Sequence, residues 1–220
     1  MMKKSKINFL FGLLITTMCV GIVNSQNDAE AKSVLDKASE TMSSFDNLSM
    51  DFDYVLDNET EDVRQEMSGD LVLEGEKYKV NLFGSTQIFD GYKTYTIIPD
   101  NEEVNISDAE ADQENTFKPS TFYSFYKQGY NYSMDELKTL KGRKIRFIKL
   151  IPIDSNSEVS MVLVGIDVES HLIQQVIEVG KNQTKTILTA KNIKTNQKLG
   201  SDVFAFDEKK YEEMDYIINK

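Results

Sequence analysis

The chain has 220 residues, and its 36 Asp and Glu against 25 Lys and Arg give a formal net charge of −11. This charge argues against a nucleic-acid binder and against attraction to anionic membrane surfaces, and it favours a soluble monomer. Hydrophobic residues make up 40% of the chain and aromatic residues 10%, which is enough for a globular domain with a core.

The first residues follow the pattern of a secretory signal peptide. Three lysines precede an apolar run from Ile7 to Val23, and small residues then allow cleavage before Gln26. An uncleaved membrane anchor is the alternative. The only cysteine, Cys19, lies inside the run. We therefore expect residues 1–25 to be removed and residues 26–220 to form one exported domain without disulfides.

Hydrophobic spacing predicts a helix from Asp28 to Met42 and a series of short strands after it. A period of two, with turns such as Asp90-Gly91, indicates half-buried antiparallel strands. This pattern predicts a mainly β fold with helices (α+β): an unclosed antiparallel barrel, or strongly curved sheet, of about ten or eleven strands wrapped round the first helix and a lid helix. A sandwich and a closed barrel are the alternatives. The expected strands span 48–57, 63–73, 78–82, 86–90, 92–98, 103–106, 144–151, 159–167, 172–179, 184–193 and, less regularly, 216–218.

An aromatic segment, Thr116 to Tyr132, interrupts the strands. Within it, the stretch from Pro119 to Gly129 carries the residues that commonly begin and end a helix. Phe122, Phe125 and Tyr126 are spaced i, i+3 and i+4 and share one face of that expected helix. We interpret these three residues as a lid over the open end of the sheet; the alternative is a structural plug that never moves.

Residues suited to catalysis or metal binding are scarce. The single histidine, His171, lies in a predicted turn and has no cysteine or Gly-x-Ser-x-Gly partner, so we expect it to be exposed. Zinc lacks ligands. The acidic run 108–114 either binds calcium or is a solvated loop, and the solvated loop is favoured. Asp51 and Asp53 either act as a catalytic acid pair or face water, and exposure to water is favoured. The basic run 141–144 is either a charged turn or a docking patch for an acidic partner. We expect no enzyme, cofactor or metal.

Several short motifs occur in an order typical of a known family. The most specific is Phe89 to Pro99, where an Asp-Gly pair is followed by an aromatic residue and a proline. The others follow the opening helix in this order: Asp51-Phe52-Asp53-Tyr54, Gly69-Asp70-Leu71-Val72-Leu73, Lys77-Tyr78-Lys79-Val80, Lys118-Pro119-Ser120 and Val203-Phe204-Ala205-Phe206-Asp207. Together, over most of the chain, they resemble the outer-membrane lipoprotein carriers (LolA-like proteins) in their Bacteroidetes-type form.

The resemblance implies a periplasmic carrier without cofactors. Such a protein would take lipoproteins by their acyl chains from an inner-membrane ATP-driven release complex and pass them to an outer-membrane acceptor. A related lipid-binding protein, such as a sensor of mislocalised lipoproteins or a carrier of another lipid or pigment, is the alternative; a hydrolase and a solid-core structural module are further ones. The arginine that helps to close the family's lid is missing between Leu73 and Lys77, and Tyr95 replaces the usual tryptophan.

The apolar faces of neighbouring predicted strands supply the candidate cavity. Taken singly, each of these residues fits ordinary core; as a set, we expect them to line an acyl-chain cavity. The set is Met50, Phe52, Tyr54, Met67, Leu71, Tyr78, Val80 and Leu82.

Overall fold

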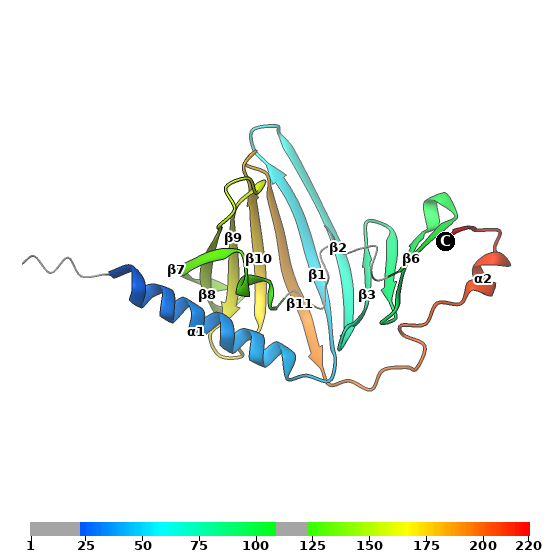
Figure 1. Cartoon of the computed structure of the whole chain (residues 1–220), viewed down its shortest axis with the longest axis horizontal. Helices are drawn as coiled ribbons and strands as arrows, with labels where there is room; N and C mark the ends of the chain where they lie inside the picture. Colours follow the sequence, from blue (N-terminus) through cyan, green and yellow to red (C-terminus); the bar gives the residue numbers. More distant parts are fainter. Residues whose placement is uncertain (1–22, 109–122) are drawn as a thin grey trace, which may run out of the picture.

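A computed structural model describes residues 23–108 and 123–220 of the chain (Figure 1). It opens with helix α1 (Val23–Ser43) and has short helices η1 (Pro99–Asn101), η3 (Phe125–Lys127) and α2 (Glu208–Glu212). Its strands are β1 (Leu48–Asn58), β2 (Val63–Glu74), β3 (Lys77–Leu82), β4 (Ser85–Phe89), β5 (Lys93–Ile98), β6 (Glu103–Asp108), β7 (Tyr130–Leu140), β8 (Arg143–Pro152), β9 (Val159–Asp167), β10 (Ile173–Gly180), β11 (Lys185–Thr195) and β12 (Ile217–Asn219).

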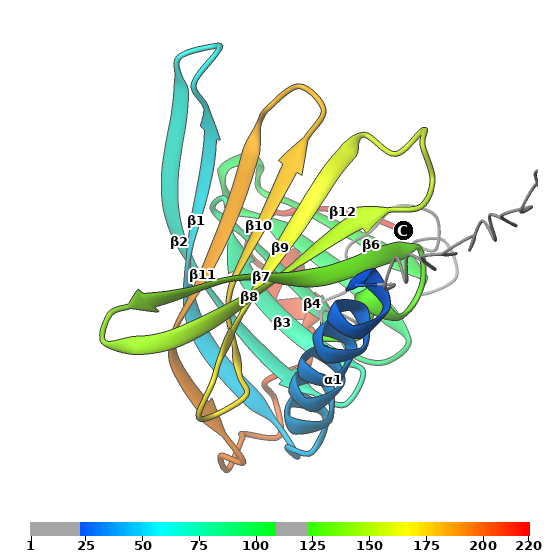
Figure 2. The same ribbon diagram turned by 90° about the vertical axis from the view of Figure 1, so that its left-hand side faces the viewer.

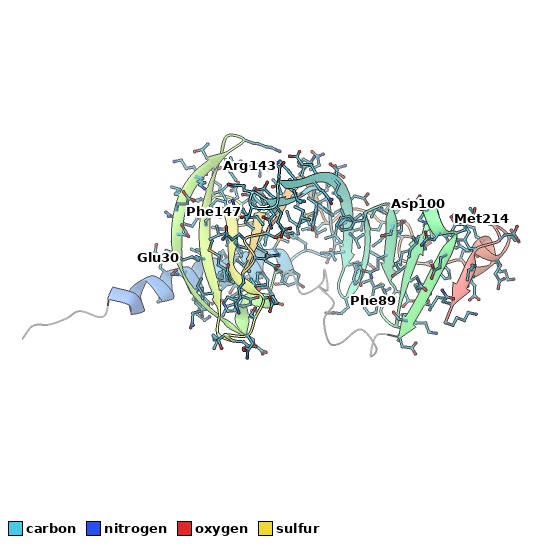
Figure 3. The ribbon with its side chains drawn as sticks, turned by 90° about the horizontal axis from the view of Figure 1, so that it is seen from above. Glu30, Phe89, Asp100, Arg143, Phe147 and Met214 are labelled. Carbon is cyan, nitrogen blue, oxygen red and sulfur yellow. The ribbon has the colours of Figure 1, made fainter. Side chains whose placement is uncertain are left out.

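The strands form one twelve-stranded sheet in the order β12-β6-β5-β4-β3-β2-β1-β11-β10-β9-β8-β7. All neighbours are antiparallel except β12 and β6, which are parallel. Within the described residues, β7 and β12 remain as edges, so the sheet is curved but unclosed, and the predicted fold class is confirmed (Figure 2). Seen from above, the sheet has two arms, with Phe147 of β8 on one and Phe89 of β4 on the other (Figure 3).

Helix α1 covers the concave face of the β8–β10 arm. Its buried residues Ala31, Leu35 and Ala38 are at most 2% exposed and pack in one cluster with Ile148 of β8 and Val164 of β9. The spacing of i, i+4 and i+7 places the three helix residues on one face, as the sequence predicts. Within the described part of the chain, no helix combines the length and apolarity that a membrane crossing requires.

The C-terminal segment covers the opposite, convex face of the β4–β6 arm. Phe204 is buried against Ile88, Ile97 and Val104. Phe206 then stacks on Tyr95, with ring centroids 4.5 Å apart. The end of the chain thus covers the apolar residues of β4 and β5 that point away from the concave face. It does not cover the concave face of this arm.

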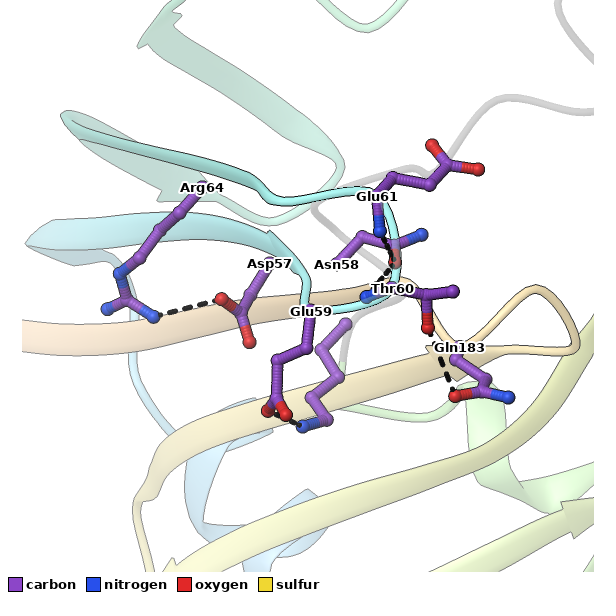
Figure 4. Close-up of polar contacts among 8 residues, drawn as sticks. Asp57, Asn58, Glu59, Thr60, Glu61, Arg64 and Gln183 are labelled. Carbon is purple, nitrogen blue, oxygen red and sulfur yellow. Dashed lines mark hydrogen bonds and ion pairs between the residues drawn. The ribbon is translucent and has the colours of Figure 1, made fainter.

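Hydrogen bonds join the turn between β1 and β2 to the turn between β10 and β11 (Figure 4). Asn58 is only 3% exposed, and its Oδ1 accepts hydrogen bonds from the backbone N–H groups of Thr60 and Glu61 at 3.0 and 3.1 Å. Its Nδ2 donates to Oγ1 of Thr184 at 2.9 Å. This side chain therefore closes one turn and joins it to the next, which fixes the long β1–β2 hairpin beside β11.

The Asp90-Gly91 pair forms the predicted tight turn. Oδ1 of Asp90 accepts from the backbone N–H groups of Tyr92 and Lys93, both at 2.8 Å. Its Oδ2 accepts from the Tyr95 hydroxyl at 3.0 Å. Burial, and next the hydrogen bond to Asp90, raises the pKa of Tyr95 from 10.0 to about 12.

We expect Tyr95→Phe to change how stability depends on alkaline pH. Because the folded state holds the Tyr95 proton more tightly, its contribution is complete below pH 10 and is lost as the pH rises towards about 12. The free energy of unfolding should therefore differ most between protein and variant below this window, and the difference should shrink within it. Denaturant titrations across the window measure this. Tyr92→Phe, at a side chain 81% exposed, is the control; a difference for Tyr95→Phe that stays constant with pH would contradict the assignment.

Candidate functional site

A cavity of about 490 Å³ lies on the concave face of the sheet. This volume is within the range of small-molecule sites, about 300–1,000 Å³. Its lining comes from the end of α1, from β1–β5 with the β3–β4 turn, and from β10 and β11. The apolar lining residues are Met42, Met50, Phe52, Tyr54, Leu71, Val80, Leu82, Phe83, Ile173, Val176, Leu188 and Ala190.

Strand register brings these side chains to one surface. Leu71 of β2 lies opposite Val80 of β3, and Tyr54 of β1 lies opposite Leu188 of β11. Directly opposed residues of antiparallel strands share a face, and every second residue returns to it. The alternation that predicts the strands therefore also builds a continuous apolar wall across them.

Gly69 gives the Phe52 ring its place in this wall. The two residues are opposite each other in β2 and β1. A Cβ at position 69 would lie 2.6 Å from Cζ of Phe52 and 2.5 Å from the backbone oxygen of Asn81. Only glycine leaves this space, so the ring of Phe52 can lie over β2 beside the cavity.

The structure brings together six of the eight predicted cavity residues and places two elsewhere. Tyr78 belongs to the buried cluster beside the cavity, where its hydroxyl donates to Oε1 of Gln87 at 3.3 Å. Met67 lies opposite Tyr54 and shares its face of the sheet, but it is not part of the cavity lining and borders a second depression. The six that line the cavity are Met50, Phe52, Tyr54, Leu71, Val80 and Leu82.

Sequence reasoning missed the wall that β10 and β11 contribute. Val176, Leu188 and Ala190 lie on predicted strands with a regular period of two, which was the available signal. It also missed Phe83 at the β3–β4 turn, whose ring lies edge-on to Tyr54 with centroids 5.1 Å apart. Phe83 is 62% exposed and lies at the rim of the cavity, so a large apolar side chain faces solvent at the entrance.

The second depression, of about 930 Å³, lies on the convex face between the β7–β8 turn and β1, β2 and β11. Its lining mixes charged residues of both signs, including Lys141 and Arg143 of the basic turn. Arg143 is labelled in Figure 3. Asp53 is there too, where a hydrogen bond from Lys191 holds the pKa of its carboxyl below the ordinary value. Asp51 is exposed and accepts from Asn192. These two carboxylates therefore do not meet in the cavity.

Only part of the aromatic segment is described, and Phe122 lies outside it. Phe125 and Tyr126 belong to the 3-10 helix Phe125–Lys127 rather than to an α-helix that continues to Gly129, so that prediction is wrong. The helix ends at Lys127, where Gln128 is already extended, and Gly129, at φ 83°, then turns the chain into β7.

Tyr126 ties this segment to α1. It is 3% exposed, and its hydroxyl donates to Oδ1 of Asp36 at 2.8 Å. Burial, and next the Asp36 carboxylate, raises the pKa of the Tyr126 hydroxyl. Phe125 packs on the same cluster of α1 and β8–β10, and neither residue is part of the cavity lining. The lid role of Phe122, Phe125 and Tyr126 stays a prediction.

The cavity is equipped for binding by apolar contact. Glu178 is the single charged side chain among its described lining residues. The described chain contains no group of three or more His, Cys, Asp and Glu residues that would hold a metal ion. His171 is partly exposed in the turn between β9 and β10, and Asp108 of the acidic run pairs with Lys93 at 3.6 Å.

The protein thus belongs to the class of unclosed, curved sheets with an apolar cavity on the concave face. The sequence matches the family of the outer membrane lipoprotein carrier protein LolA over residues 22–181, and the chain belongs to this family. The predicted resemblance to this family is thereby confirmed, and its Bacteroidetes-type form stays a prediction. The family is one of carriers, not of enzymes.

Solved structures show how widely the fold is shared. An uncharacterized conserved protein from Thermus thermophilus is 8% identical with a TM-score of 0.54; the match covers 86% of this chain and 98% of that one. The lipoprotein LppX from Mycobacterium tuberculosis is 13% identical with a TM-score of 0.52, over 80% of this chain and 100% of that one. No curated protein matches the sequence.

Proposed function

We propose that this protein is a periplasmic carrier that binds the acyl chains of lipoproteins in the concave cavity and moves them from the inner to the outer membrane. The observation that carries the proposal is the apolar cavity itself, in a chain of the lipoprotein carrier family. The convex depression is a poorer site for alkyl chains because charged side chains line it.

The energetics of an acyl chain suit such a site. Removing each CH₂ group from water is worth about 0.8 kcal/mol, so a multiply acylated protein does not leave a membrane unaided. A soluble carrier must offer apolar surface and later give it up without breaking a bond. The cavity supplies that surface on β1–β3 and β11, and the exposed Phe83 extends it to the entrance.

The remaining parts of the proposal concern location and partners. The N-terminal signal pattern supports export to the periplasm. There the carrier would receive lipoproteins from an ATP-driven release complex of the inner membrane and deliver them to an acceptor at the outer membrane. We infer that the protein works without catalysis, metal or cofactor, because binding and release suffice for this task.

A two-step transfer experiment tests the proposed function. Inner-membrane vesicles that contain the release complex and a labelled triacylated lipoprotein are supplied with ATP and the purified protein, and the soluble fraction is then mixed with outer-membrane vesicles. We expect soluble lipoprotein in complex with this protein, followed by transfer. A lipoprotein whose acylated cysteine is replaced by serine is the control and should not bind. Failure of release contradicts acyl-chain binding; release without transfer contradicts a carrier and fits a sensor.

A further inference from the structure

Gln174 is a partly buried polar residue that lines the apolar cavity and also borders the convex depression. Its Nε2 is the only buried side-chain nitrogen or oxygen atom of the described chain that lacks a hydrogen-bond partner. Its neighbour Gln175 differs, because Nε2 of Gln175 donates to Oγ1 of Thr189 at 2.8 Å. Buried N–H donors in proteins are nearly always paired, so an unpaired one at a binding cavity indicates a missing acceptor.

Strand β10 is irregular at Gln174. The pairing of β10 with β9 shifts between Ile173 and Gln175, so Gln174 is the additional residue of a bulge. Bulges interrupt alternation and redirect a side chain. Ile173, Gln174, Gln175 and Val176 all contribute to the cavity lining, although regular alternation would turn two of these four side chains away.

The charge of the wall limits which acceptor fits. An alkyl chain has no acceptor, so the partner of the Gln174 amide must be an oxygen elsewhere in the ligand. The described lining contains no lysine or arginine, and its one charged residue, Glu178, is acidic. A free carboxylate or a phosphate would therefore enter without a counter-charge, which is unfavourable in apolar surroundings. A neutral carbonyl meets the requirement.

We propose that Gln174 donates a hydrogen bond to the neutral ester or amide carbonyl of a bound acyl chain, and that it thereby selects acylated ligands over free fatty acids. This inference rests on the proposed binding of acyl chains in the cavity. It assigns to one side chain the recognition of the linkage, while the apolar wall holds the chain itself.

A matched pair of lipids tests the role of Gln174. 1-Monopalmitoylglycerol and 1-O-hexadecylglycerol have chains of equal length, but only the first has a carbonyl. Each displaces a fluorescent apolar probe, N-phenyl-1-naphthylamine, from the purified protein below the concentration at which the lipids aggregate. We expect the ester to bind about fivefold to tenfold more tightly than the ether, the value of one hydrogen bond of about 1–1.4 kcal/mol. Palmitate at neutral pH should bind more weakly than the ester.

Two variants distinguish the contribution of the Gln174 amide from that of the rest of the cavity wall. Gln174→Leu keeps the size of the side chain and removes the donor, so we expect the ester preference to vanish while affinity for the ether is kept. Gln175→Leu is the matched control, because the Gln175 amide is already paired with Thr189, and it should retain the preference. Loss of the preference in Gln175→Leu but not in Gln174→Leu would overturn the assignment.

The remaining outcomes are distinct. Equal affinity of the unsubstituted protein for ester and ether overturns the role of Gln174 and leaves the cavity as a binding site. Absence of binding of the probe and both lipids contradicts the proposed function itself. Should Gln174→Leu fail to fold, the infrared band of an isotope-labelled ester carbonyl bound to the unsubstituted protein decides. A shift to lower frequency than in an alkane solvent supports the hydrogen bond, and an unshifted band overturns it.

Discussion

Val80→Asp should abolish the uptake of an apolar probe while the protein stays folded. Val80 lies in the cavity wall opposite Leu71 and Gln87, and its side chain is partly exposed to the cavity. An aspartate is too short to carry its charge out to water, and an unpaired charge beside an alkyl chain costs several kcal/mol. We therefore expect affinity to fall at least about 100-fold, which corresponds to about 2.7 kcal/mol. Fluorescence titration measures the affinity, and circular dichroism checks the fold.

Lys79→Asp is the control for this variant. Lys79 precedes Val80 in β3 and pairs with Val72 and Ile88, so it belongs to the convex face. The same amino acid introduced one position earlier should therefore leave probe binding intact. An equal loss of affinity in both variants would show that the concave face is not where the probe binds.

Gly69→Ala should produce the largest loss of stability among conservative changes in the wall. The added Cβ would lie 2.5 Å from the backbone oxygen of Asn81 and 2.6 Å from Cζ of Phe52. A backbone atom of a paired strand cannot move away alone, so β2 and β3 must separate locally and the Phe52 ring must shift. Overpacking of this kind typically costs about 1–3 kcal/mol. Urea unfolding measures the loss, and the displaced ring should also weaken probe binding.

Gly180→Ala provides the comparison at another strand glycine. There the close atom is Oδ1 of the Asn182 side chain at 2.6 Å, and the next is the backbone oxygen of Thr184 at 3.6 Å. Rotation of the Asn182 side chain relieves the conflict, so we expect a clearly smaller loss of stability than for Gly69→Ala. Equal losses would mean that the contact with Phe52 and Asn81 is not what makes glycine necessary at position 69.

Strands with unbroken alternation were predictable, whereas β7 was not. The sequence pattern places Tyr130 and Tyr132 of β7 in the aromatic segment, and the pairing of β7 with β8 shifts between Met134 and Leu137. A bulge removes the period of two on which strand prediction depends. The polar pair Asp135-Glu136 inside the bulge further hides the strand, because an edge strand tolerates residues that a central strand excludes.

The composition of the cavity depends on contacts between distant segments. Alternation shows which side chains of β1 share a face, but not that Asp53 of β1 pairs with Thr189 of β11, which places the β10–β11 wall beside it. Gln174 lies in a bulge, and the hydroxyl of Tyr126 donates a hydrogen bond to Asp36, 90 residues earlier in the chain. None of these relations leaves a periodic signal in the sequence.

A photoactivatable palmitoyl ester, cross-linked to the purified protein and mapped by mass spectrometry, tests most directly whether the concave cavity holds acyl chains. We expect cross-links in peptides of β1, β3 and β11, at Met50, Val80 and Leu188, and we expect unlabelled 1-monopalmitoylglycerol to compete them away. Competable cross-links confined to the convex depression, at Val55 and Ile187, or labelling that no lipid competes, would contradict the account.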